Sequence, residues 1–281
     1  MSDLTYGQAV VLGVVQGLTE FLPVSSSAHL AVAQNRLRLD PAATPMHVVD
    51  GVVHVATVLA MLIVFAGPFR RFLVRLFAEI SEPFENARPL RKDAWRSVGL
   101  TVVASVPTAL IGLFFKDAFE RSFGDSVNVG LGLVITGGML VMTALLKRGR
   151  RGFRRFHWKH ALFVGIAQGI AISPGISRSG ATICMASFFG LRRRWAAEFS
   201  FLIAMPAILG ATLLKFREAW QSSGGAGLGL APGPLLAAFI ASLVVGVISL
   251  RLLLSAVRRA KLHYFAWYCW LVGGLLFAGI L

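Results

Sequence analysis

Long apolar runs, separated by short charged or glycine-rich stretches, dominate the pattern of this chain. The short alternating strands of an outer-membrane barrel are not seen in the sequence. A run of about 20 apolar residues is long enough to cross a bilayer as a helix. Six runs have this character: 48–66, 97–115, 128–146, 196–214, 233–254 and 263–281. The pattern therefore predicts an all-α polytopic membrane protein with six transmembrane helices.

Two further apolar segments, residues 7–35 and 160–190, are interrupted in the middle. The first is broken by PVSSSAH at 23–29, and the second by SPGISRSG at 173–180. Clusters of Ser, Pro and Gly interrupt helices, and non-helical backbone is not stable against lipid. We therefore expect two re-entrant helical hairpins that are buried within the protein.

Composition agrees with a membrane protein and argues against a nucleic-acid partner. The 281 residues are 56% hydrophobic and 15% charged, with a net charge of +15. The basic residues cluster in short loops such as 67–96 and 147–159, which is the pattern of cytoplasmic loops. Loops 116–127 and 215–232 lack this excess and are expected outside. The first hairpin then enters from the outside, the second from the cytoplasm, and both termini are extracytoplasmic.

The two interrupted segments resemble each other. Aligned without a gap, GVVQGLTEFLPVSSS (13–27) and GIAQGIAISPGISRS (165–179) share five residues. Each hairpin is followed by three spans, and this odd number inverts the second copy. Chance similarity of two glycine-rich segments is the alternative. We predict one membrane domain, 1–281, with an inverted repeat: half one at 1–146 and half two at 160–281, joined by the basic loop.

An inverted repeat brings the two breaks together near the membrane midplane. In each hairpin a serine cluster immediately precedes the second apolar half. Serine favours helix N-caps, and the free N–H groups of a helix N-terminus suit an anion such as phosphate. The alternative is that these hydroxyls only cap helices. The candidate phosphate-binding residues are Ser25, Ser27, Ser177, Arg178, Ser179 and Thr182.

Ionisable residues inside these apolar segments are few, and burying them is costly. Arg178 is a candidate phosphate clamp, because its planar guanidinium matches phosphate oxygens. Glu20 is a candidate base or ligand of a divalent cation. The alternative is that the two residues form one buried ion pair between the hairpins.

Other polar side chains lie near these two in the pattern. Gln16 shares a helix face with Glu20, and His29 is a candidate proton shuttle or an ordinary core histidine. Asp50 and His54 share one face of the span 48–66. With Glu198 they either support the site or mark helix ends.

Four stretches resemble one known family. QGLTEFLPVSSSAH (16–29) and SPGISRSGATI (173–183) resemble the signatures of the integral-membrane undecaprenyl-diphosphate phosphatases, the bacitracin-resistance type. DGVVHVATVLA (50–60) and EFSFLIAMPA (198–207) are similar to further family stretches. The resemblance implies hydrolysis of undecaprenyl diphosphate to undecaprenyl phosphate and phosphate, which recycles the lipid carrier of cell-wall synthesis.

The resemblance also implies site residues and a cofactor. It carries over Glu20, Ser26, His29, Ser177, Arg178 and Thr182. It implies Mg²⁺ or Ca²⁺, held by Glu20 and, in a supporting role, Gln16. Many members have Glu at the position of Gln16. Because Gln16 has no charge, the role of base or metal ligand falls mainly to Glu20. We assign Ser26 as the attacking or phosphate-orienting hydroxyl; attack by a metal-activated water stays open.

The resemblance places the protein in the bacterial inner membrane, with a site that opens to the extracytoplasmic side. Expected partners are a polyprenyl diphosphate lipid and the bilayer, but no nucleic acid, and a homodimer is one candidate assembly. Inverted repeats are also typical of transporters. A transporter or flippase of an anionic polyprenyl phosphate is therefore the alternative function.

Overall fold

The computed structural model describes residues 4–40, 43–77, 89–146, 149–222 and 231–280. These residues form α-helices and one short 3₁₀ helix, and the only β-pairing among them is an isolated bridge. The helices are α1 Tyr6–Thr19, α2 Ser26–Arg36, α3 Thr44–Val64, α4 Ala66–Phe77, α5 Pro89–Phe114, α6 Lys116–Phe123, α7 Ser126–Leu145, η2 Phe153–Arg155, α8 Trp158–Ile170, α9 Arg178–Phe188, α10 Arg193–Ser222, α11 Pro232–Arg258 and α12 Tyr264–Phe277. The predicted all-α class is confirmed.

Five of the six predicted spans correspond to helices that are long and apolar enough to cross a membrane. They lie in α3, α5, α7, α10 and α11. The sixth predicted span, 263–281, contains the shorter apolar helix α12. The described α12 has 14 residues, or about 21 Å of helix, against a bilayer core of about 30 Å. Left-handed backbone at Ala260 (φ 60°) and Gly279 (φ 67°) bounds it on either side.

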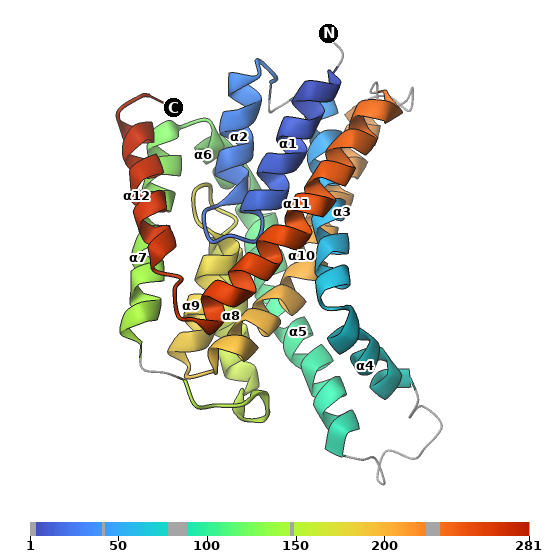
Figure 1. The fold of residues 1–281 in the computed structure, drawn as a ribbon, viewed down its shortest axis with the longest axis vertical. Coiled ribbons are helices and arrows are strands. Elements are labelled where there is room, and N and C mark those ends of the chain that lie inside the picture. Colours follow the sequence, from blue (N-terminus) through green and yellow to red (C-terminus); the bar gives the residue numbers. More distant parts are fainter. Residues whose placement is uncertain (1–3, 41–42, 78–88, 147–148, 223–230, 281) are drawn as a thin grey trace.

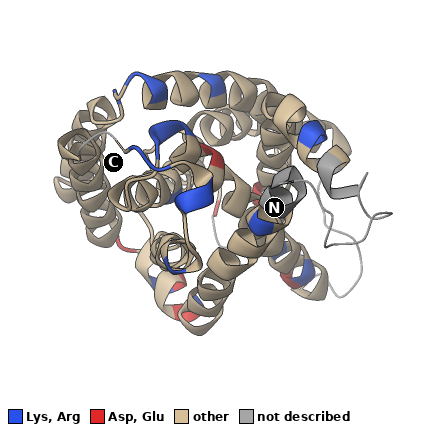
Figure 2. Ribbon diagram, turned by 90° about the horizontal axis from the view of Figure 1, so that it is seen from below, with Lys and Arg blue, Asp and Glu red and all other residues tan. Residues whose placement is uncertain are grey.

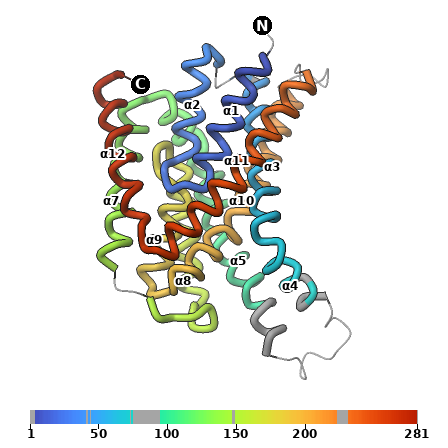
Figure 3. Tube along the Cα trace, in the orientation of Figure 1, coloured from blue at the N-terminus to red at the C-terminus, as the bar shows by residue number. Residues whose placement is uncertain are grey.

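Both interrupted segments fold as helical hairpins, as the sequence predicts. The first consists of α1 and α2, and the second of α8 and α9. In Figure 1 the first hairpin descends from the end of the molecule where both termini lie, which we call the terminal end. The second rises from the opposite end, and the chain trace in Figure 3 shows the two turns near mid-height.

The opposite end carries most of the basic loops, so we call it the basic end. Figure 2 views the molecule from this end, with Lys and Arg on helix ends and loops. The predicted loop 67–96 is corrected, because α4 and the start of α5 occupy much of it. In α4, half-buried Phe69 and Phe72 alternate with exposed Arg70 and Arg71, so the segment is an amphipathic helix. Residues 78–88 and 147–148 of the basic loops lie outside the described part.

Equivalent helices of the two halves make equivalent contacts. Helix α1 packs on α11, as α8 packs on α5, while α3 packs on α10 and α7 on α12. The shared glycines explain the first two contacts. Gly17 lies against the backbone of Ser242 and Gly246, and Gly165 against that of Ala104. Small residues allow such close approach of helices in membranes. The boundaries at 146 and 160 stay a prediction.

Candidate active site

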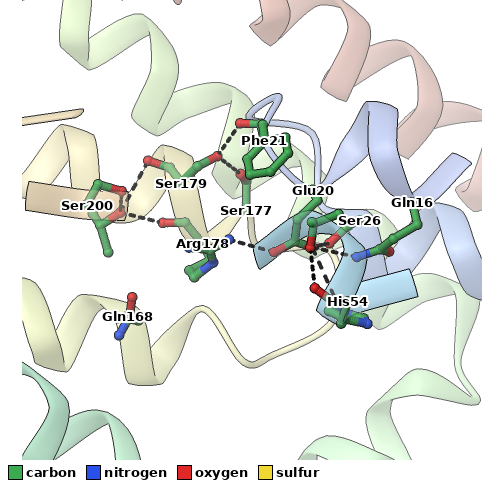
Figure 4. Close-up of polar contacts among 12 residues, drawn as sticks. Gln16, Glu20, Phe21, Ser26, His54, Gln168, Ser177, Arg178, Ser179 and Ser200 are labelled. Carbon is green, nitrogen blue, oxygen red and sulfur yellow. Dashed lines mark hydrogen bonds and ion pairs between the residues drawn. The ribbon is translucent and has the colours of Figure 1, made fainter. Parts of the chain in front are cut away.

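Glu20 is the centre of a polar cluster where the two hairpins meet. It directly follows α1 and is 6% exposed. Its Oε1 accepts a hydrogen bond from Arg178 Nη2 at 2.6 Å. Its Oε2 accepts from Ser26 Oγ at 2.7 Å and from Gln16 Nε2 at 2.9 Å. Figure 4 shows these side chains converging from α1, α2 and α9. The structure therefore brings four predicted residues together.

The backbone of the first hairpin is strained at the turn that presents Ser26. Ser25 has φ 67° and ψ 94°, in the left-handed region that non-glycine residues rarely adopt. Such a conformation costs about 1–3 kcal/mol and clusters at functional sites. Ser25 does not cap α2; its hydroxyl lies 3.3 Å from Ser27 Oγ. Ser26 is then the first residue of α2, with its hydroxyl directed at Glu20.

The second hairpin holds Arg178 in a regular capped turn. Ser177 Oγ accepts from the Gly180 N–H at 3.2 Å, which is a normal N-cap. The Ser177 N–H donates to Thr136 Oγ1 at 2.9 Å, and this bond ties the turn to α7. Ser179 Oγ donates to the Phe21 carbonyl at 3.0 Å, across to the first hairpin. The guanidinium therefore projects from the N-terminus of α9, fixed on both sides.

The buried ion pair that the sequence offered as an alternative is present. Its Glu20 side chain is 4% exposed and its Arg178 side chain 15%. One donor is left over, because Arg178 Nη1 is buried without a hydrogen-bond partner among the described residues. An unpaired buried donor costs about 1–3 kcal/mol, more when it is charged. This donor is available to a further acceptor, such as a phosphate oxygen.

His54 extends the cluster on the side of α3. Its Nε2 lies 3.8 Å from Glu20 Oε2. Its Nδ1 lies 2.6 Å from the Asp50 carbonyl, one turn earlier. The Asp50 carboxylate does not reach Glu20; it pairs with Lys215 Nζ at 2.7 Å and accepts from Gln34 Nε2 at 2.9 Å. The sequence analysis does not single out Lys215, although a lysine directly after the apolar run 196–214 is one sign of a candidate site residue.

Comparison with known proteins shows the family of this chain. The family described as "Bacitracin resistance protein BacA" matches residues 9–275. The chain belongs to the BacA family. An undecaprenyl-diphosphatase of Syntrophotalea carbinolica is 42% identical over 98% of this chain and 99% of the relative. One of Carboxydothermus hydrogenoformans is 40% identical over 95% and 94%. The resemblance of the signatures is thus confirmed, and this BacA-family chain is a multi-pass membrane protein.

His29 and Thr182 of this BacA chain make no hydrogen bond to Glu20 among the described residues. His29 Nδ1 lies 2.8 Å from the Ser25 carbonyl, and its Nε2 lies 2.7 Å from the Tyr268 hydroxyl. No sequence pattern singled out Tyr268, an aromatic residue in an apolar run. Thr182 donates back to the Arg178 carbonyl at 2.8 Å and lies 2.5 Å from Ser200 Oγ, so it fastens α9 to α10.

Glu198 makes a local ion pair. It accepts from Arg194 Nε at 2.7 Å, one turn earlier on the same helix. The Arg194 side chain is 68% exposed. The pair lies near the start of α10 at the basic end, and among the described residues it has no bond to the cluster around Glu20. This geometry favours the alternative that Glu198 marks a helix end, and its role in the site stays a prediction.

The oxygens around Glu20 suit a hard cation. Gln16 Oε1 is buried without a partner among the described residues, next to the carboxylate that Gln16 Nε2 contacts. In this described part, no three His, Cys, Asp or Glu side chains gather at metal spacing. Mg²⁺ commonly uses one or two carboxylates and completes its shell with water and substrate phosphates. The residues therefore fit a cation held jointly with a phosphate, and its presence stays a prediction.

Proposed function

We propose that this BacA-family protein hydrolyses undecaprenyl diphosphate to undecaprenyl phosphate and inorganic phosphate. The names of its relatives support this activity. The observation that carries it is the Arg178 guanidinium, which lies beside the Glu20–Ser26 hydrogen bond and keeps one buried donor unpaired. A guanidinium at a helix N-terminus is suited to phosphate oxygens.

Arg178 and the N-terminus of α9 bind the terminal phosphate in this proposal. The guanidinium now pairs with Glu20 Oε1. When Arg178 turns to phosphate, this oxygen becomes available, while Oε2 keeps its hydrogen bond from Ser26. Substrate binding and activation of Ser26 are thereby coupled through one side chain.

Ser26 is the proposed nucleophile, because its hydroxyl already donates to Glu20 Oε2 at 2.7 Å. A bond forms between Ser26 Oγ and the terminal phosphorus, and the hydroxyl proton passes to Glu20. The bond from that phosphorus to the bridging oxygen breaks, and undecaprenyl phosphate leaves. Water then attacks the phosphoserine, the Oγ–P bond breaks, and Ser26 recovers its proton from Glu20. Both hydrogens of the water leave with the inorganic phosphate.

A divalent cation, Mg²⁺ or Ca²⁺, is part of the proposal. Glu20 and Gln16 Oε1 would hold it together with phosphate oxygens. When bound, it neutralises charge on the diphosphate. His29 is the candidate for proton exchange with water, through the half-exposed Tyr268 hydroxyl.

We further propose that the protein lies in the bacterial inner membrane and that its site opens at the terminal end, on the extracytoplasmic side. The charge asymmetry supports this orientation, because basic loops gather at the opposite end. The partners are the polyprenyl diphosphate and the surrounding lipid. A homodimer is retained as a prediction, to be checked by mass in detergent.

A phosphate-release assay on a prenyl diphosphate in detergent tests the function, with and without chelator. Wild type should release phosphate and lose activity with chelator, while Ser26→Ala should be inactive. Ser105→Ala is the matched control, since Ser105 Oγ bonds only within α5, to the Thr101 carbonyl at 2.8 Å. Rapid acid quench of wild type should trap phosphoserine. Movement of labelled undecaprenyl phosphate across liposomes without phosphate release would instead favour the transporter.

A further inference from the structure

A second polar group lies between Glu20 and the terminal end, outside the proposed chemistry. Lys215 of α10 pairs with Asp50 of α3 at 2.7 Å, and Gln34 of α2 donates to the same carboxylate at 2.9 Å. Three helices thus meet at one carboxylate. Lys215 and Asp50 lie toward the ends of α10 and α3 that reach the terminal end (Figure 1).

This group is connected to the site by His54. The His54 ring lies one turn deeper on α3, with Nδ1 2.6 Å from the Asp50 carbonyl and Nε2 3.8 Å from Glu20. Side-chain exposure falls along the series: 35% for Lys215, 24% for His54 and 15% for Arg178. A charged side chain in a membrane protein faces protein or a water-filled passage, not lipid. Exposure therefore decreases from Lys215, near the terminal end, to Arg178 beside Glu20.

We propose that phosphate reaches Glu20 from the terminal end along these side chains and that Lys215 is its outer binding residue, a role that rests on the proposed function. Three basic side chains of increasing burial lead an anion inward, as charged clefts do for their ligands. The ammonium has three N–H donors, and among the described residues it bonds only the Asp50 carboxylate. It can thus hold a phosphate group, from either the lipid diphosphate entering or free phosphate leaving.

The competing explanation is an interhelical ion pair with no ligand. The two explanations predict opposite signs for Asp50→Asn. If Lys215 binds phosphate, removing the competing carboxylate strengthens phosphate binding. If the pair only joins α3 to α10, Asp50→Asn and Lys215→Gln both lower stability and neither changes phosphate binding specifically.

The test uses the full chain in detergent, with inorganic phosphate as the probe and the thermal shift that phosphate produces as a readout without turnover. Lys215→Gln should weaken phosphate binding about three- to tenfold, Lys215→Arg should restore most of it, and Asp50→Asn should tighten it. Lys116→Gln is the matched control. Lys116 is also paired with a carboxylate near the terminal end, that of Glu218 on α10, but both side chains are far more exposed than Asp50.

Kinetic measurements on Lys215→Gln distinguish the entering lipid diphosphate from the leaving free phosphate. A rise in KM for a short-chain prenyl diphosphate in Lys215→Gln assigns the residue to entry, and weaker inhibition by free phosphate assigns it to exit. Unchanged phosphate affinity in Lys215→Gln, or weaker affinity in Asp50→Asn, overturns the proposal. Because the thermal shift needs no turnover, it gives its answer even if the protein releases no phosphate from the lipid.

Discussion

The two hairpins have the same turn sequence in outline but different backbones. Ser25 and Ser177 are equivalent in the gapless alignment. Ser177 has φ −76° and caps α9 through the Gly180 N–H. Ser25 has φ 67° and makes no cap bond to α2. The relaxed hairpin carries the binding residue Arg178, and the strained hairpin carries Ser26 and Glu20.

The same division runs through the other equivalent positions. Gln16 donates to Glu20, whereas its equivalent Gln168 donates to Thr108 Oγ1 at 3.2 Å and to the Ile203 carbonyl. The position of Glu20 is Ile172 in the second copy. One copy therefore presents these positions to the proposed site, while the other uses them to fix helices. In the proposed function, two diverged copies form one site instead of two.

The strongest test of this division is Glu20→Gln, which removes the charge but keeps the shape. Loss of a general base typically lowers kcat by about 10²–10⁴-fold, and we expect this range for phosphate release. Ile172→Val at the equivalent position should change kcat less than about twofold. Equal losses in both variants would mean that the two copies share the chemistry.

Packing of the hairpins gives the next contrast. A Cβ at Gly17 would meet the backbone of Ser242 and Gly246, whereas one at the equivalent Gly169 would meet the Ile111 side chain. A side chain can move and a backbone cannot, so Gly17→Ala should destabilise more, by about 1–3 kcal/mol. Thermal denaturation in detergent measures both variants. A larger loss in Gly169→Ala would contradict the packing seen here.

These two contrasts differ in how far the sequence predicts them. The breaks at 23–29 and 173–180 and the shared glycines predict the hairpins, because Ser, Pro and Gly interrupt apolar helices regardless of tertiary context. Burying a charged side chain in a membrane is costly, and this cost marks Glu20 and Arg178 as candidate site residues. The sequence analysis assigns the segment of α4 to a loop, because its three arginines resemble the basic residues of a cytoplasmic loop.

The remaining parts of the site depend on tertiary contacts. Tyr268 reaches His29 from 239 residues away, and Lys215 reaches Asp50 from 165 residues away. Neither pairing has a local pattern, so periodicity cannot find it. Glu198 shows the converse case, since its charge at a span start has a local partner, Arg194, four residues earlier. The left-handed Ser25 is likewise set by the turn as a whole, since serine has no preference for that region.

Substitutions at Ser25 and Ser177 should change stability by a smaller amount, and in opposite directions in the two turns. Ser177→Ala removes an N-cap and should destabilise by about 1 kcal/mol. Ser25→Gly relieves left-handed backbone, worth about 1 kcal/mol or more, against the loss of one hydrogen bond to Ser27. Its denaturation midpoint should therefore be at or above that of wild type. Matching decreases in both variants would show that the Ser25 turn stores no strain.

The helices that follow the hairpins give the smallest expected effect. His54 on α3 lies 3.8 Å from Glu20, whereas Glu198 on α10 forms its ion pair with Arg194 on the same helix. An exposed pair one turn apart contributes about 0.3–0.5 kcal/mol. Glu198→Gln should therefore lower stability by no more than that and leave phosphate release within about twofold of wild type. His54→Gln, measured beside it, should lower kcat clearly, because it removes the ring nearest the Glu20 carboxylate. A loss in Glu198→Gln as large as in His54→Gln would mean that the second copy also reaches the reacting groups through α10.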